Sequence, residues 1–152
     1  MNKKILFIGL GVIIFAALIG VFTTDKQEVQ EYMVPLPDDV VKQYFTAWND
    51  KRYQDMYATI SDGFKKIEPT AKDLTTFKEY VDSQNIKKIN IKKIEEKFND
   101  GLTAQVEYLV EFILADDEKK EFAGTFTLKY RQGDIILGWK LIHPYGENID
   151  AA

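Results

Sequence analysis

The sequence predicts one α+β domain in which three short helices precede a curved, four-stranded antiparallel sheet. Apolar residues recur at helical spacing between Val40 and Ile60, and they alternate with polar residues from Leu102 to Leu114. The length agrees, because 152 residues are enough for one hydrophobic core and too few for two. Helices followed by hairpin-connected strands are typical of α+β folds.

An elbow should join the first two helices. Pro37 suits the first turn of the first helix, and Asn49-Asp50 should end that helix and cap the second. We expect Ser61-Asp62-Gly63 to stop the second helix, with positive φ at Gly63. The two apolar stripes consist of Val40, Val41, Tyr44, Phe45 and Trp48, and of Tyr53, Met56, Tyr57 and Ile60.

The third helix and the first hairpin follow. Thr70-x-x-Asp73 approximates a capping box, so a helix should begin at Thr70 and fade at residues 83–85. Ile89 and Ile91 then share one face of a strand that continues toward Phe98. The Asp-Gly pair in the turn at residues 99–101 tolerates positive φ at both turn positions.

Three more strands complete the predicted sheet. The strand over residues 102–114 is long for a small domain, so the sheet should bend around the helices as a half-open cone, with Gly124 as a bend point. The inward positions of the last two strands are Phe122, Gly124, Phe126, Leu128 and Tyr130, and Ile135, Leu137, Trp139 and Leu141.

The N-terminal residues predict a location. Lys3 and Lys4 precede an uncharged apolar run over residues 5–22, long enough to span a bilayer, which we interpret as a membrane anchor or signal sequence. The positive residues before it place the C-terminal domain outside the cytoplasm, single-pass or secreted after cleavage. We divide the chain into residues 1–22, a tether over 23–36, a domain over 37–146 and a tail over 147–152.

Composition excludes several classes of function. The chain has no cysteine, which rules out disulfides, thiol catalysis and thiolate zinc sites. Without Lys3 and Lys4, 18 of the 20 basic residues stand against 24 acidic ones, a net charge of −6 that disfavours nucleic-acid binding. We expect no cofactor and no metal.

The helix pair carries a resemblance to a known family. The segment VVKQYFTAWNDKRYQDMYATIS and the late Gly138-Trp139-Lys140-Leu141 resemble the nuclear transport factor 2-like superfamily. More narrowly, the chain looks like the noncatalytic N-terminal domain of methicillin-resistance-type penicillin-binding proteins, which also follows a membrane anchor. The transpeptidase motifs of those proteins are missing: Asp62-Gly63-Phe64 follows Ser61, and Gln84-Asn85-Ile86 follows Ser83.

His143 is the only histidine and the one candidate catalytic residue. Imidazole titrates near neutral pH, so His143 can serve as a general base if a carboxylate orients it, with Asp38, Asp62 or Glu147 as candidates. The alternative is a strand-end residue that packs beside Pro144.

The polar-tipped residues Tyr108 and Tyr130 are the candidate ligand-binding positions on the inward face. Cones of this fold often hold a cavity, and similar enzymes such as ketosteroid isomerase place acids inside it. We expect ordinary aromatic core here instead. The lysines between Lys87 and Lys97 either bind an anionic polymer or form a solvated face that protects the sheet edge, which we favour. The acidic turn over residues 116–118 is interpreted as solvated.

These observations favour a noncatalytic scaffold or interaction domain at the outer membrane face, linked to cell-wall synthesis and the antibiotic response. We expect a protein partner there, with self-association left open. One alternative is an assembly component of a type IV secretion apparatus, whose inner-membrane assembly protein has one anchor and this fold. The other is a small-ligand-binding or isomerase- or lyase-type enzyme of the same fold.

Overall fold

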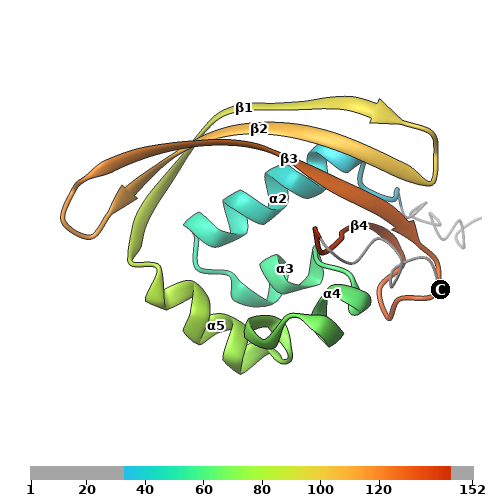
Figure 1. Cartoon of the computed structure of the whole chain (residues 1–152), viewed down its shortest axis with the longest axis horizontal. Helices are drawn as coiled ribbons and strands as arrows, with labels where there is room; N and C mark the ends of the chain where they lie inside the picture. Colours follow the sequence, from blue (N-terminus) through green and yellow to red (C-terminus); the bar gives the residue numbers. More distant parts are fainter. Residues whose placement is uncertain (1–32, 145–152) are drawn as a thin grey trace, which may run out of the picture. The chain divides into compact units, whose positions relative to one another are not determined.

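Four antiparallel strands form a meander whose concave face holds the helices (Figure 1). The computed structural model describes residues 33–144; the predicted segment 1–22, most of the tether and the tail lie outside them. The helices in this part are α2 (Pro37–Asn49), α3 (Tyr53–Ala58), α4 (Asp62–Ile67), the 3-10 helix η1 (Pro69–Ala71) and α5 (Leu74–Ser83). The strands are β1 (Ile86–Asn99), β2 (Thr103–Leu114), β3 (Lys119–Arg131) and β4 (Gly138–Leu141).

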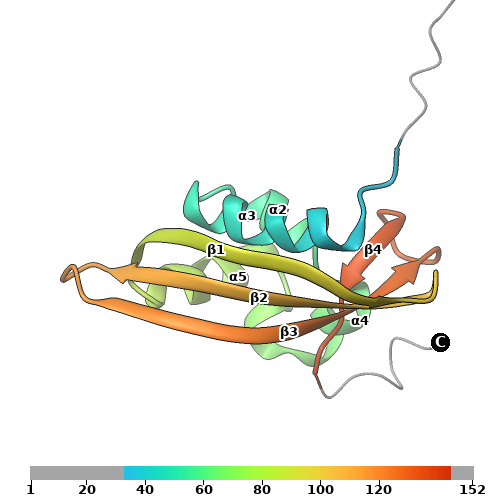
Figure 2. The same cartoon turned by 90° about the horizontal axis from the view of Figure 1, so that it is seen from above.

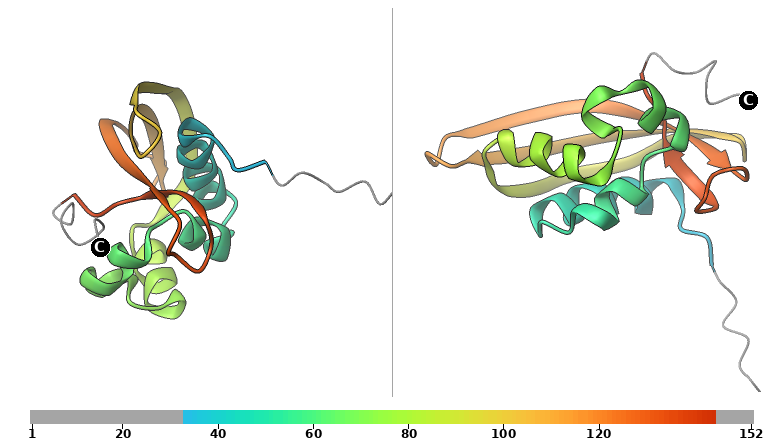
Figure 3. Two further views of the ribbon diagram at one scale, coloured as in Figure 1. Left: turned by 90° about the vertical axis from the view of Figure 1, so that its right-hand side faces the viewer. Right: turned by 90° about the horizontal axis from the view of Figure 1, so that it is seen from below.

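The predicted α+β class and the four-stranded meander are confirmed. The three long strands run side by side, and the short β4 lies beyond β3 at one end (Figure 2). Seen from below, the helices cover the concave face of the sheet (Figure 3). Among residues 33–144 no helix has both the length and the apolar character needed to cross a membrane.

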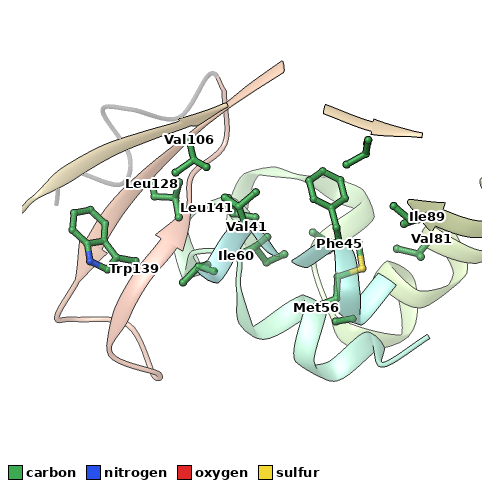
Figure 4. Packing of buried hydrophobic residues seen from close by; sticks show 14 of the residues in the cluster. Val41, Phe45, Met56, Ile60, Val81, Ile89, Val106, Leu128, Trp139 and Leu141 are labelled. Carbon is green, nitrogen blue, oxygen red and sulfur yellow. The ribbon is translucent and has the colours of Figure 1, made fainter. Parts of the chain in front are cut away.

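The core lies between α2 and the sheet. Val41 of α2 lies near Val106 of β2 and Leu128 of β3, and Phe45 of α2 lies above Met56 of α3 (Figure 4). The alternation predicted for β2 is confirmed, because Ala104, Val106 and Val110 are fully buried. Each buried aliphatic side chain contributes about 1.5–3 kcal/mol relative to exposure, so this seam fixes how α2 sits on the sheet.

The second helix is shorter than predicted and a further helix follows it. Residues 59–61 leave the helix to run beside β4: the Ser61 N–H donates to the Leu141 carbonyl at 2.9 Å, and the Leu141 N–H donates to the Thr59 carbonyl at 2.9 Å. The Ser61 hydroxyl then caps α4 by accepting from the Phe64 N–H at 3.0 Å. Gly63 lies inside α4 and does not have positive φ, so both expectations for this turn were wrong.

Two predicted caps are also corrected. Asp73, rather than Thr70, caps α5, since its carboxylate accepts from the Thr76 N–H at 2.8 Å and Thr70 lies in η1. The side chain of Asn49 does not cap α3; its Oδ1 accepts from the Ile89 N–H at 2.8 Å, which ties the end of α2 to β1.

The turns and the last strand differ in detail from the prediction. Gly101 has positive φ and Asp100 does not, because the Asp100 carboxylate accepts from two following N–H groups and holds the turn. The fourth strand begins at Gly138, so residues 135–137 form an exposed loop. Gly124 makes room for a neighbour: a Cβ there would lie 2.6 Å from the Tyr108 hydroxyl.

Candidate functional site

A cavity of about 280 Å³ lies between the helices and the last two strands. Most of its lining is apolar and comes from α2, α4, α5, β3 and β4. The lining residues are Tyr44, Ile60, Phe64, Glu68, Thr70, Ala71, Phe77, Tyr80, Phe126, Leu141, Ile142 and Pro144. The volume is just below the range of about 300–1,000 Å³ that is usual for small-molecule sites. The cone therefore contains a hollow that the sequence analysis had expected to be filled.

Glu68 is the one carboxylate in the lining. It precedes η1, and its Oε1 accepts from the Thr70 hydroxyl at 2.8 Å and from the Thr70 N–H at 3.1 Å. Its other oxygen lies 3.3 Å from Nε2 of His143. These contacts hold the carboxylate at the wall of the cavity, with Thr70 on one oxygen and His143 on the other.

His143 stands behind Glu68. The residue follows β4, where the Ile142 N–H donates to the Thr127 carbonyl at 3.1 Å, and its ring packs edge-on against Phe64 at 4.9 Å between centroids. It does not itself line the cavity. In this position His143 can orient Glu68, but it does not face a molecule bound in the hollow.

The pKa of Glu68 is lowered. The hydrogen bonds from the Thr70 side chain and backbone are the main cause, and the contact with His143 adds to them. A carboxylate with a lowered pKa stays ionised at neutral pH and is a weak base. It accepts hydrogen bonds well, whereas proton abstraction at neutral pH is favoured by carboxyl groups of raised pKa.

Tyr44 contributes a phenol to the lining of the cavity. Burial raises its pKa, and the neighbouring phenols of Tyr80 and Tyr108 raise it further, so the hydroxyl stays protonated. The ring packs edge-on against Phe126 at 5.6 Å. The hydroxyl makes no hydrogen bond to any group in residues 33–144, which is uncommon for a polar atom in such surroundings.

The predicted site residues are only partly brought together. Tyr108 stacks on Phe126 at 4.7 Å and Tyr130 packs against Trp139 at 5.6 Å, and neither lines the cavity. The carboxylate beside His143 is Glu68. Asp62 instead pairs with Lys65, and the Asp38 carboxylate accepts from the N–H of the next residue. Glu147 lies outside the described residues.

Glu68 and Thr70 were missed by the sequence reasoning. The one available signal was the tripeptide Glu68-Pro69-Thr70. An acid placed before proline can accept hydrogen bonds from the residues that follow it.

The lysines of β1 pair with acids. Lys97 lies 2.8 Å from Glu95, Lys93 lies 3.7 Å from Glu107, and Lys87 lies 2.7 Å from Asp117 of the acidic turn. These pairs form a solvated charged face across neighbouring strands. No three His, Asp or Glu side chains in residues 33–144 converge as metal ligands.

A second hollow lies at the far end of the domain. It is an open groove of about 560 Å³ lined by Trp48, Lys51, Tyr53, Lys78, Val81, Asp82, Asn85, Ile86, Lys87 and Ala115. The Tyr53 hydroxyl donates to the Asp82 carboxylate, and Lys78 lies over the Tyr53 ring at 5.5 Å. Because these polar groups satisfy one another, the smaller and more apolar cavity is the better candidate site.

Comparison with known proteins identifies the fold. No protein-family model and no curated protein matches the sequence. A SEC-C motif containing protein from Psychrobacter arcticus aligns with a TM-score of 0.52 at 12% identity, over 80% of this chain and 66% of that one. Δ5-3-Ketosteroid isomerase from Mycobacterium sp. aligns with a TM-score of 0.51 at 10% identity, over 72% of this chain and 92% of that one.

A nuclear transport factor 2-like protein of unknown function from Shewanella oneidensis MR-1 aligns with a TM-score of 0.49 at 11% identity, over 69% of this chain and 94% of that one. At such identities the likeness concerns the fold alone. It agrees with the helices, the meander and the cone-shaped hollow described above. Residues 33–144 therefore share the fold of the SEC-C motif containing protein and of the ketosteroid isomerase.

Proposed function

We propose that this domain is a noncatalytic binding module whose cone cavity takes a small, mostly apolar molecule with one polar group. The observation that carries the proposal is the pairing of an apolar lining with two unequal polar groups, the ionised Glu68 and the phenol of Tyr44. A few placed polar groups in an apolar pocket are what orient a small ligand.

The chemistry of Glu68 favours binding over catalysis. Its lowered pKa suits an acceptor for a ligand hydroxyl or N–H group and suits a proton-abstracting base poorly. His143 positions this carboxylate from behind. The cavity lining has no cysteine, serine or lysine that could serve as a nucleophile, and its Thr70 hydroxyl already donates to Glu68.

We place the module at the outer face of a bacterial membrane. The support is the sequence: Lys3 and Lys4 before the uncharged run over residues 5–22, with the domain after it. A role beside cell-wall synthesis, through the narrower resemblance to penicillin-binding proteins, remains our first choice of setting. A place in a type IV secretion apparatus is the alternative, and a protein partner that binds the sheet is expected in either case.

One observation favours a second candidate function. Glu68 lines the cone cavity and His143 lies 3.3 Å from it, so the two provide a base and its orienting group, as an isomerase- or lyase-type enzyme requires. Solvent deuterium incorporation into 2-cyclohexenone, followed by mass spectrometry, tests this candidate. Incorporation that His143→Gln abolishes would establish proton abstraction and displace the noncatalytic proposal.

The binding proposal is tested with two matched probes, 2-naphthol and 2-methylnaphthalene, which differ in a hydroxyl and a methyl group. The full chain should bind both at one site, and Glu68→Gln should weaken 2-naphthol about tenfold, the equivalent of one charged hydrogen bond. Binding of 2-methylnaphthalene should not change. Tyr53→Phe, in the open groove, is the control variant and should leave both affinities unaltered.

The proposal fails if neither probe binds saturably. It also fails if Glu68→Gln weakens both probes equally, since that would mean a general disturbance of the fold rather than a lost acceptor. Fluorescence titration of 2-naphthol measures these affinities directly.

A further inference from the structure

One end of the domain exposes an unusual number of apolar side chains. They come from three segments: the chain before α2, the β1–β2 hairpin and the β3–β4 loop. We call them the apolar end, defined as Leu36, Phe98, Leu102, Ile135, Ile136 and Leu137, which are between 43% and 93% exposed. Single exposed apolar residues are ordinary, but a group of six at one end calls for a cause.

Contacts within the domain bring these segments together. The Tyr130 N–H donates to the Leu102 carbonyl at 2.9 Å, which joins the hairpin to the end of β3. A Cβ at Gly138 would lie 3.3 Å from Val34, so the loop returns beside the first described residues. All three segments lie at the right-hand end in both Figure 1 and Figure 2.

The β3–β4 loop is held firmly while its side chains are exposed. The buried Asp134 carboxylate accepts from the Asp62 N–H at 3.0 Å and pairs with Arg131 at 3.1 Å. The Ile135 N–H in turn donates to the Asp62 carboxylate at 3.1 Å. Ile135 itself is 93% exposed, although its backbone donor is satisfied. A fixed backbone that presents aliphatic side chains to the outside is suited to contact with an apolar phase.

The opposite end of the sheet has a different surface. The β2–β3 turn over residues 115–118 contains Asp116, Asp117 and Glu118, and Lys87 pairs with Asp117 at 2.7 Å. This turn lies at the left-hand tip in Figures 1 and 2. The domain thus has one apolar and one charged end along its longest axis.

We propose that the apolar end rests in the interfacial layer of the bilayer, with Ile135, Ile136 and Leu137 inserted among the lipid headgroups. This inference rests on the membrane location proposed above. The chain enters the domain at this same end, and only residues 23–32 separate Met33 from the uncharged run over 5–22. Ten residues span at most about 33–36 Å, so the apolar end stays within reach of the membrane surface.

The expected lipid requirement follows from the residues involved. None of the six members of the apolar end is cationic, so contact needs no anionic lipid and should occur on neutral phosphatidylcholine. Arg131, the nearest cation in the loop, is already paired with Asp134.

The absence of cysteine from the chain makes single-site labelling direct. Full chains with Ile135→Cys or Asp117→Cys are labelled with the fluorophore NBD and reconstituted in phosphatidylcholine vesicles that contain doxyl-lipid quenchers. The Ile135→Cys label should be quenched severalfold more than the Asp117→Cys label at the charged end. A Leu102→Cys label should be quenched similarly, and much less after Ile136→Ser and Leu137→Ser are added.

Equal quenching at positions 135 and 117 in chains that stay in the vesicles after alkaline extraction would overturn this inference and leave the membrane location intact. Chains that alkaline extraction removes would overturn both. Shielding of position 135 that grows with the protein-to-lipid ratio would mean that a second copy of the chain covers the apolar end, which also contradicts the proposal.

Discussion

The two hollows of this domain differ in a way that size does not explain. The open groove between α2, α5 and β1 is about 560 Å³; among its polar groups the Tyr53 hydroxyl donates to Asp82, and Lys87 pairs with Asp117 outside the lining. The cavity under β3 and β4 is about 280 Å³, and its lining combines aromatic rings with Glu68 and with a Tyr44 hydroxyl that has no hydrogen-bond partner in residues 33–144. Polar groups that already have partners gain little from binding a ligand. An apolar cavity with an available hydrogen-bond donor can both bury apolar ligand surface and orient the ligand.

The largest expected effect is a difference in unfolding free energy between a substitution in the cavity and one in the open groove. Phe77→Ala removes a buried ring of the cavity wall that packs on Tyr57 at 5.3 Å, and it should lower the free energy of unfolding by about 3–5 kcal/mol. Trp48→Ala in the groove should cost less, because that ring is only partly buried. Urea denaturation of both variants gives the order, and a larger loss for Trp48→Ala would contradict it.

The next effect concerns acid. The pKa of Glu68 in the folded domain is below its ordinary value of 4.5, so the stabilisation from this carboxylate is present above that pH and is lost as pH falls through the folded pKa. In the Glu68→Gln variant, the free energy of unfolding should therefore fall less steeply as the pH is lowered below 4.5. Denaturant midpoints measured from neutral pH downward test this, and an unchanged slope would mean that the bonds from Thr70 do not persist in solution.

Tyr44→Phe is expected to be neutral or slightly stabilising. The substitution keeps the ring contact with Phe126 and removes a hydroxyl that has no partner in residues 33–144. Removing an unsatisfied polar group recovers its desolvation cost, on the order of 1 kcal/mol. Thermal unfolding monitored by circular dichroism gives the result. A clear loss of stability would show that the hydroxyl has a partner and that the cavity is less apolar than described.

The smallest effect is expected in the groove. Tyr53→Phe removes the bond to Asp82 at the surface, and such exposed contacts contribute about 0–1 kcal/mol. Its pKa shift offers a second readout, because the bond to Asp82 raises the pKa of Tyr53 to about 12. In an Asp82→Asn variant, spectrophotometric titration should show that the phenol transition near pH 12 moves to lower pH; an unchanged titration would mean that the bond is absent.

The sequence predicted the sheet better than the site. Period-two alternation over β2 identified Ala104, Val106 and Val110 as core, because a strand face is buried or exposed as a unit. The helices were less accurate near Ser61, where hydrogen bonds to Leu141, 80 positions away in sequence, end α3 early. Such contacts leave no local pattern.

The cavity itself could not be predicted, since the same aromatic residues can fill a cone or line it. Glu68 was overlooked for a related reason: its partners are Thr70, two residues away, and His143, which follows the last strand. The exposure of Ile135 and Leu137 was missed because their alternation with polar neighbours resembled a strand, whereas the Asp62–Asp134 contacts hold them in a loop.

The location of bound 2-naphthol tests the central claim most directly. A crystal structure of the complex should place the naphthyl ring between Phe77 and Phe126, with its hydroxyl within hydrogen-bond distance of the Glu68 carboxylate. A ring bound against Trp48 and Tyr53 in the open groove, with the cone cavity unoccupied, would contradict the account.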